Sequence, residues 1–282
     1  MRAFRLRPLG VCLALPWLAA CGADDDFKPT PPFSNLDDVR VWANASSALG
    51  VYSNVYQVLA VADGHETFAD AQCPVVADDG TTFTAVGDCT DSAERDWTGQ
   101  ATVERDGDDR KLTLDGFNGD TGVVTQHLVE PGLHEFTATL ELGGVTSIDY
   151  SGSVRGDYTG ESVWNGSGQV KRQGFLAPNG EVHATTLDEI VADAVCSGQP
   201  ASGSTTLESG QDTAVITYDG ETDCDDDKNA QLSVNGKDRG MIDGISCAVH
   251  ACGTGGGSRS AAVAIASVLG LGWFRRRSRP TI

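Results

Sequence analysis

The chain has 282 residues, 40 of them acidic and 20 basic, and its formal net charge is −20. A surface of that sign repels nucleic acid, so the composition excludes a nucleic-acid-binding protein. Gly-x-Ser-x-Gly, His-Glu-x-x-His, phosphate-loop and dinucleotide motifs are all missing from the sequence, and the His-Glu pairs at His65 and His134 lack the second histidine of a zinc motif. The sequence therefore predicts no catalytic residues and no enzymatic activity.

Residues 1–20 have the pattern of a secretory signal peptide. Three arginines among the first seven residues precede an apolar run over 9–20, which is too short to span a bilayer. The run ends in Leu18-Ala19-Ala20-Cys21, and this motif resembles the lipobox of bacterial lipoproteins. The resemblance implies that Cys21 carries lipid and becomes the mature N-terminus. An ordinary signal-peptide cut after Ala23 is the alternative.

The same resemblance implies an exported protein, anchored by the lipid on Cys21 at the bacterial outer membrane or cell surface. Its expected partners are membrane lipid and the export and sorting machinery. All 40 acidic residues lie between Asp24 and Asp243, whereas 8 of the 20 basic residues lie in the two ends. This charge favours solubility outside the cell. Residues 21–35 contain several prolines and are expected to form a tether that spaces the domain from the membrane.

One amphipathic helix is predicted over residues 36–62. Apolar residues recur there at three- and four-residue steps, which is typical of a helix with one buried face. Ser34 and Asp37 have the spacing of a capping box, and Gly64 ends the pattern. Gly50 is expected to loosen the helix near its middle.

Residues 73–89 predict a hairpin closed by a disulfide. Asp78-Asp79-Gly80 is a turn signal near the midpoint, and strand-forming residues flank it. Antiparallel strands that leave this turn would bring Cys73 and Cys89 together. In the chain-entropy model, closing such a loop contributes about 3 kcal/mol.

Short alternating segments predict an antiparallel sheet with one wet face. Apolar residues at 136, 138 and 140 alternate with Thr137 and Thr139, and the period of two continues over 148–154. Five turn dipeptides separate such segments: Asp106-Gly107, Pro131-Gly132, Gly143-Gly144, Asn179-Gly180 and Asn235-Gly236. The predicted fold class is mainly β: an antiparallel β-meander or curved sheet packed against one N-terminal amphipathic helix, α+β in detail.

The β-rich domain is expected over residues 36–250, and a subdivision near 187–200 is one interpretation. The run 187–195 is compatible with a helical turn or a strand, and further strands are expected near 213–218 and 230–234. The cysteines of this half are disulfide candidates with open connectivity. Cys196 with Cys224 and Cys224 with Cys247 are both compatible pairings.

The densest acidic segment has the opening spacing of a calcium loop. Four oxygen-bearing residues fall at alternate positions: Asp223, Asp225, Asp227 and Asn229. An EF-hand loop needs glycine at the position of Lys228 and glutamate at the position of Val234, so an EF-hand is excluded. This segment has two interpretations: a calcium site less regular than an EF-hand, or a solvated acidic turn. No other cofactor is indicated.

The C-terminus consists of a glycine-rich spacer, residues 251–260, and a short hydrophobic segment with an arginine cluster, residues 261–282. The apolar part is shorter than the roughly 20 residues of a membrane span. The tail resembles the MYXO-CTERM sorting signal of exported myxobacterial proteins. This resemblance implies that Cys252 is the sorting cysteine and that the segment after it is removed. A C-terminal membrane helix, or a Cys247–Cys252 disulfide that argues against sorting, are the alternatives.

Three functions are compatible with these features. The prediction is a non-catalytic lipoprotein, anchored at the surface or envelope, that displays a β-rich domain. The first alternative is a carrier for lipid or another apolar ligand, enclosed between the sheet and the helix. The second is a hydrolase with an unrecognised site. The sequence identifies no ligand and no protein partner.

Overall fold

The computed structural model describes Phe33 and residues 35–46, 48–156, 161–174, 178–192, 200–220 and 230–242, with the side chains of 48–54 and 192 left out. The described residues form two helices and fifteen strands. The helices are α1 (Leu36–Ser46) and α2 (Ala48–Ala62). The strands are β1 (Val75–Asp78), β2 (Thr82–Val86), β3 (Cys89–Thr90), β4 (Asp96–Trp97), β5 (Gln100–Asp106), β6 (Asp109–Phe117), β7 (Asp120–Glu130), β8 (Leu133–Leu142), β9 (Thr146–Gly156), β10 (Glu161–Arg172), β11 (Gly180–Ala192), β12 (Pro200–Ser209), β13 (Asp212–Tyr218), β14 (Ala230–Val234) and β15 (Lys237–Ile242).

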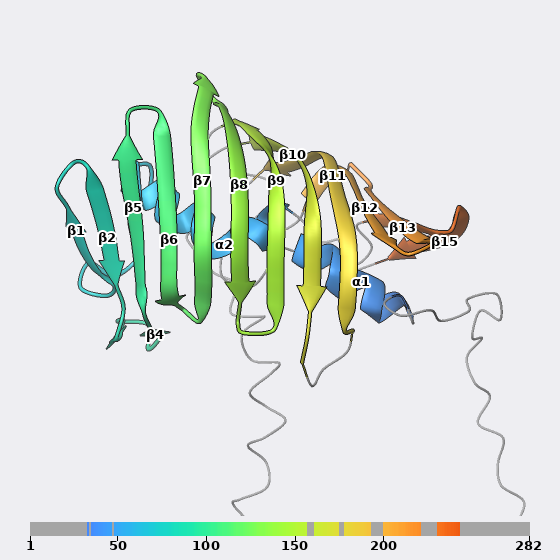
Figure 1. Cartoon of the computed structure of the whole chain (residues 1–282), viewed down its shortest axis with the longest axis horizontal. Helices are drawn as coiled ribbons and strands as arrows, with labels where there is room; N and C mark the ends of the chain where they lie inside the picture. Colours follow the sequence, from blue (N-terminus) through green and yellow to red (C-terminus); the bar gives the residue numbers. More distant parts are fainter. Residues whose placement is uncertain are drawn as a thin grey trace, which may run out of the picture.

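Thirteen strands form one open sheet in which they follow one another in chain order, with β2 next to β5 because β3 and β4 lie outside this sheet (Figure 1). All of these pairs are antiparallel, and β3 with β4 makes a separate two-stranded sheet. The predicted fold class, a mainly β antiparallel meander, is confirmed. Strands β11 and β12 belong to the same sheet and pair from His183–Glu208 to Val191–Pro200. The ambiguous run after Thr186 is a strand as far as Ala192, and β12 is a strand that the sequence did not predict.

Two helices, α1 to Ser46 and α2 from Ala48, occupy the range in which one helix was predicted. Residue 47, which separates them, lies outside the described residues. The Ser46 hydroxyl donates to the Trp42 carbonyl oxygen at 2.6 Å, so it competes with the backbone for a helical acceptor. At the start of α1, the Asn35 side chain accepts a hydrogen bond from the Asp38 N–H, so Asn35 serves as the observed cap.

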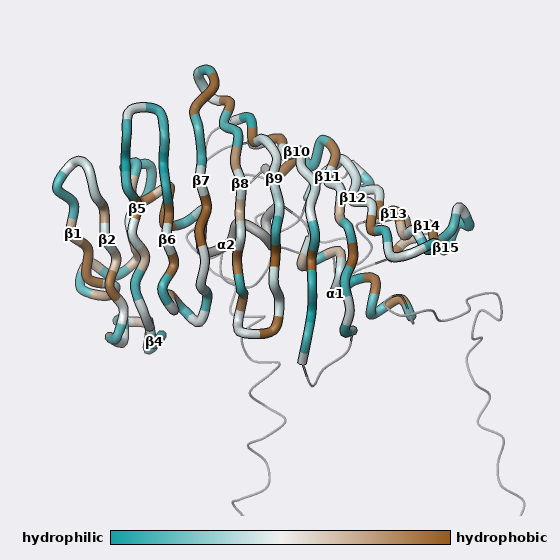
Figure 2. Tube along the Cα trace, in the orientation of Figure 1, coloured by the Kyte–Doolittle hydropathy of each residue, from teal (hydrophilic) through white to brown (hydrophobic). Residues whose placement is uncertain are grey.

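Period-two alternation separates an apolar face of the sheet from a polar one (Figure 2). In β8, Phe136, Ala138 and Leu140 are buried, whereas Thr137 and Thr139 are exposed. Both helices lie behind the sheet in Figure 1, on its apolar face, and this placement buries their own apolar residues. One face of the sheet therefore packs against the protein's own helices, and the other face is exposed to water.

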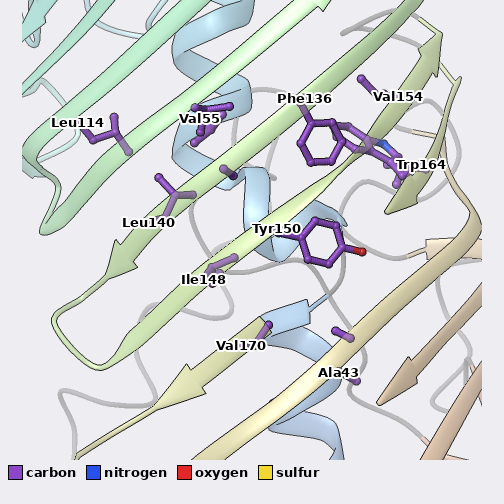
Figure 3. Packing of buried hydrophobic residues seen from close by; sticks show 14 of the residues in the cluster. Ala43, Val55, Leu114, Phe136, Leu140, Ile148, Tyr150, Val154, Trp164 and Val170 are labelled. Atoms are coloured by element: carbon purple, nitrogen blue, oxygen red, sulfur yellow. The ribbon is translucent and has the colours of Figure 1, made fainter. Parts of the chain in front are cut away.

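Large side chains fill the centre of the apolar face (Figure 3). The Phe136 ring lies 6.1 Å from Trp164 and stacks on Tyr150 at 6.3 Å, measured between ring centroids. Trp42 of α1 and Leu59 of α2 are at most 1% exposed. The space between helices and sheet is thus occupied by the protein's own side chains.

One glycine, Gly166, makes room for Tyr150 in the middle of the sheet. Gly152 and Gly166 are directly paired across β9 and β10, next to a bulge after Trp164. A Cβ at Gly166 would lie 2.4 Å from Cε1 of Tyr150, which is closer than real Cβ contacts come. The ring therefore takes the space that a side chain at this position would need.

Arg105 of β5 links three elements at the end of α2. Its guanidinium donates to the Asp78 carboxylate of β1 at 2.8 and 3.0 Å, and also to the Ala62 carbonyl oxygen. The neighbouring Arg110 donates to Asp63 at 2.9 Å. Cationic side chains near a helix C-terminus donate hydrogen bonds to its free carbonyl groups and interact favourably with the negative end of the helix dipole. The hydrogen bond from Arg105 also lowers the pKa of Asp78.

A buried carboxylate organises the loop between β3 and β4. The side chain of Asp91 has no exposed surface and accepts hydrogen bonds from the Arg95 Nε at 2.6 Å, from Trp97 Nε1 at 3.1 Å and from the Ala93 N–H at 2.8 Å. Burial by itself would raise the pKa of Asp91, but these bonds outweigh it and lower the pKa to about 2. The ionised carboxylate holds Trp97 in the core.

We predict that Arg105→Met destabilises the protein by about 2 kcal/mol, because Asp78 and the end of α2 both lose a largely buried charged donor. Urea denaturation measures the effect. The matched control is Lys111→Met on the adjacent strand, which breaks an exposed ion pair with Glu104 and should cost under about 1 kcal/mol. Equal losses in both variants would contradict the role given to Arg105.

We predict that Asp91 contributes stability at neutral pH that is lost on acidification. Its folded pKa is about 2 and its ordinary value is 3.8, so the contribution is complete above pH 3.8 and disappears as the pH falls through 2. Asp91→Asn should be less stable than wild type at neutral pH, and the gap should narrow between pH 4 and pH 2. Urea midpoints at several pH values measure this gap. A gap that stays constant would show that the charge of Asp91 is irrelevant.

Candidate functional site

An open groove of about 1000 Å³ crosses strands β5 to β10, and all of its lining residues belong to these strands. Its floor is the backbone of a row that includes Arg105, Phe136, Gly152 and Gly166, whose register aligns them across the sheet. The side chains of Arg105 and Phe136 point toward the helices, into contacts with Ala62 and the core. The groove therefore lies on the polar face, opposite the helices.

Hydroxyl side chains form one wall of the groove. The strand register places Thr125, Thr137, Ser151 and Ser167 side by side on β7, β8, β9 and β10. The Thr125 and Thr137 hydroxyls are hydrogen-bonded to each other at 2.6 Å. Beyond the groove, Thr185 of β11 and Thr206 of β12 continue the row. We call these six residues the hydroxyl row.

The second wall changes from charged to neutral along the groove. Its paired residues are, in strand order from β6 to β10, Asp109, His127, Glu135, Ser153 and Asn165. His127 Nδ1 lies 2.7 Å from the Asp109 carboxylate, and Lys111 lies 3.0 Å from Glu104 near the same end. Carboxylates thus gather at the β5–β6 end, whereas the β9–β10 end offers hydroxyl and amide groups.

Of the cysteines predicted to have a role, Cys73 and Cys89 are brought together, with their sulfurs 2.00 Å apart in a disulfide. The hairpin between them has the predicted strands and turn, since β1 pairs with β2 from Val75–Val86 to Asp78–Phe83. The remaining predicted site residues lie outside the described residues: Cys21, Cys196, Cys224, Cys247, Cys252, Asp223, Asp225, Asp227 and Asn229.

The two His-Glu pairs do not assemble a metal site in the described part of the chain. His134 of β8 lies near Asp63 and Arg110, close enough to His65 to be affected by its charge. Partial burial is the main reason that the pKa of His134 is lowered. No group of three or more histidines, cysteines, aspartates or glutamates in the described residues could hold a metal ion.

A second polar cluster lies inside the apolar face, beneath α1. A bulge between Leu187 and Ile190 reverses the alternation of β11, so the fully buried Glu189 points inward. Glu189 accepts hydrogen bonds from Thr205 at 3.4 Å and from Tyr218 at 3.5 Å. Burial raises the pKa of Tyr218 well above its usual value. The cluster has no exposed side chain and acts in packing, not as an accessible site.

No protein-family model, no curated protein and no solved structure matches the chain. Its class is therefore defined by its own structure: an open antiparallel meander with helices on one face and a polar groove on the other. Within the described residues, neither helix has the length and hydrophobicity to cross a membrane.

Sequence reasoning did not single out the groove. It placed Thr137 and Ser151 on a wet face, which is where they lie, but it had no register between strands. The available signal was the recurrence of serine or threonine at the wet positions of successive strands. That signal becomes a site only when the register aligns the hydroxyl groups in one row.

Proposed function

We propose that the chain is a non-catalytic, exported lipoprotein that presents this β-sheet domain at the cell envelope, with the polar groove as its binding surface. The groove of about 1000 Å³ is the observation that carries the proposal, because it is a concave, solvent-accessible surface built on rigid strands. The lipobox at Cys21 and the proline-containing tether support the location. A tether between the lipid anchor and the domain would leave the polar face exposed to water.

The filled apolar face favours this function over an apolar-ligand carrier. Such a carrier needs a preformed apolar cavity between sheet and helices. Here Trp42, Phe136 and Trp164 occupy the centre of that space, and each is at most 4% exposed. A ligand of lipid size would have to displace them.

The groove also favours binding over hydrolysis. Its histidine, His127, pairs with Asp109, but their side chains are 56% and 64% exposed. A catalytic base is normally shielded from water, and this exposed pair is not. The Ser and Thr residues of the hydroxyl row are arranged for hydrogen bonding, and a nucleophile needs in addition a base that contacts it.

We predict that Cys21→Ala abolishes acylation of the protein and releases it from the membrane fraction. Labelling cells with an alkyne-bearing fatty acid measures the acyl group, and fractionation measures the anchor. Cys12→Ala is the matched control, since Cys12 lies within the signal peptide and its loss should leave labelling unchanged. Cys252→Ala tests for a second acylated cysteine. Full labelling of the Cys21→Ala and Cys252→Ala double variant would contradict the proposal.

A further inference from the structure

We propose that the groove binds a neutral, linear oligosaccharide that lies across strands β5 to β10. The inference rests on the proposed function, since it assigns a ligand class to the same groove. It follows from three properties of the groove: its direction, the chemistry of its walls and the distribution of its charge.

The direction of the groove argues for an elongated ligand that is not a peptide strand. The groove runs perpendicular to the strands, and the backbone of β6 to β9 is already paired on both sides. A peptide strand gains its affinity from free backbone groups at a sheet edge, which this surface lacks. The ligand must therefore be recognised by side chains.

The walls offer repeated groups that both donate and accept hydrogen bonds. Each hydroxyl of Thr125, Thr137, Ser151 and Ser167 has one donor and two acceptor positions, as does each hydroxyl of a sugar. Neighbouring strands are about 4.8 Å apart, which is close to the length of one hexose in an extended chain. Successive sugar rings can thus meet successive members of the hydroxyl row. Ser153 and Asn165 offer the same chemistry from the opposite wall.

The charge of the groove selects against polyanions. Four carboxylates line it, at Glu104, Asp106, Asp109 and Glu135, together with three cations, at Arg105, Arg110 and Lys111. Arg105 and Arg110 are paired with Asp78 and Asp63, and the whole chain carries a net charge of −20. An anionic polymer would be repelled, whereas a neutral one meets no such penalty. Carboxylates also accept strong hydrogen bonds from hydroxyl groups, so Glu135 can contribute to binding a neutral sugar.

Isothermal titration calorimetry on the purified mature chain tests the inference. The probes are cellohexaose, maltohexaose and chitohexaose as neutral chains, with hexagalacturonate as the anionic comparison. The variant is Thr137→Val combined with Ser151→Ala, which removes two groove hydroxyls. The control is Thr139→Val, on the same strand and the same exposed face but outside the groove lining.

We expect at least one neutral hexasaccharide to bind, the double variant to bind it about tenfold or more weakly, and Thr139→Val to bind it like wild type. Binding of no neutral probe at millimolar concentration would overturn the inference. Equal affinity of all three proteins, or tighter binding of hexagalacturonate, would overturn it as well. Such failures leave the acylation result at Cys21 unaffected, so the two proposals are separable.

Discussion

Burial of one face of a single long sheet is the constraint on which the rest of the structure depends. An open meander with a period-two pattern has an apolar face that must be removed from water. Burial of this face stabilises the fold by about 25 cal/mol per Å² of apolar surface. Helices α1 and α2 cover that face, and Arg105 attaches the end of α2 to β5 and to the β1–β2 hairpin. The opposite face is then left to the solvent, which is why it can carry the polar residues that line the groove.

Local irregularities in the sheet adapt it to this arrangement. Gly166 leaves space for the Tyr150 ring, so the core comes close to the backbone beneath the groove. Its partner Gly152 leaves space for the backbone of β10, since a Cβ there would lie 2.0 Å from the Asn165 carbonyl oxygen. The bulge in β11 turns Glu189 inward, where the hydroxyl groups of Thr205 and Tyr218 donate to its Oε2. A buried carboxylate is tolerated only with such partners, and this one lies under α1, whose Ser46 carbonyl oxygen accepts a bond from Thr186. Polar groups thus help to specify where the helix docks.

The division of the sheet into a filled face and an open face connects the proposed location with the proposed binding. If the domain bound an apolar ligand on this face, the helices would have to move away from the sheet. Here large aromatic residues pack the helices and the sheet into one core. Recognition is then confined to hydrogen bonds and charge on the wet face. Hydrogen bonds in water contribute little individually, so a repeated ligand that meets several strands at once is the kind that such a surface favours.

The sequence by itself determined the strand-rich class, the chain-order meander and the Cys73–Cys89 hairpin. These depend on short-range information: alternation over a few residues, turn dipeptides, and two cysteines on either side of one turn. Tertiary structure alone decided the strand β12, the inward position of Glu189 and the alignment of the hydroxyl row. The physical reason is that each of these depends on partners distant in the chain. A bulge changes which face a residue occupies, and the register between strands decides which side chains become neighbours.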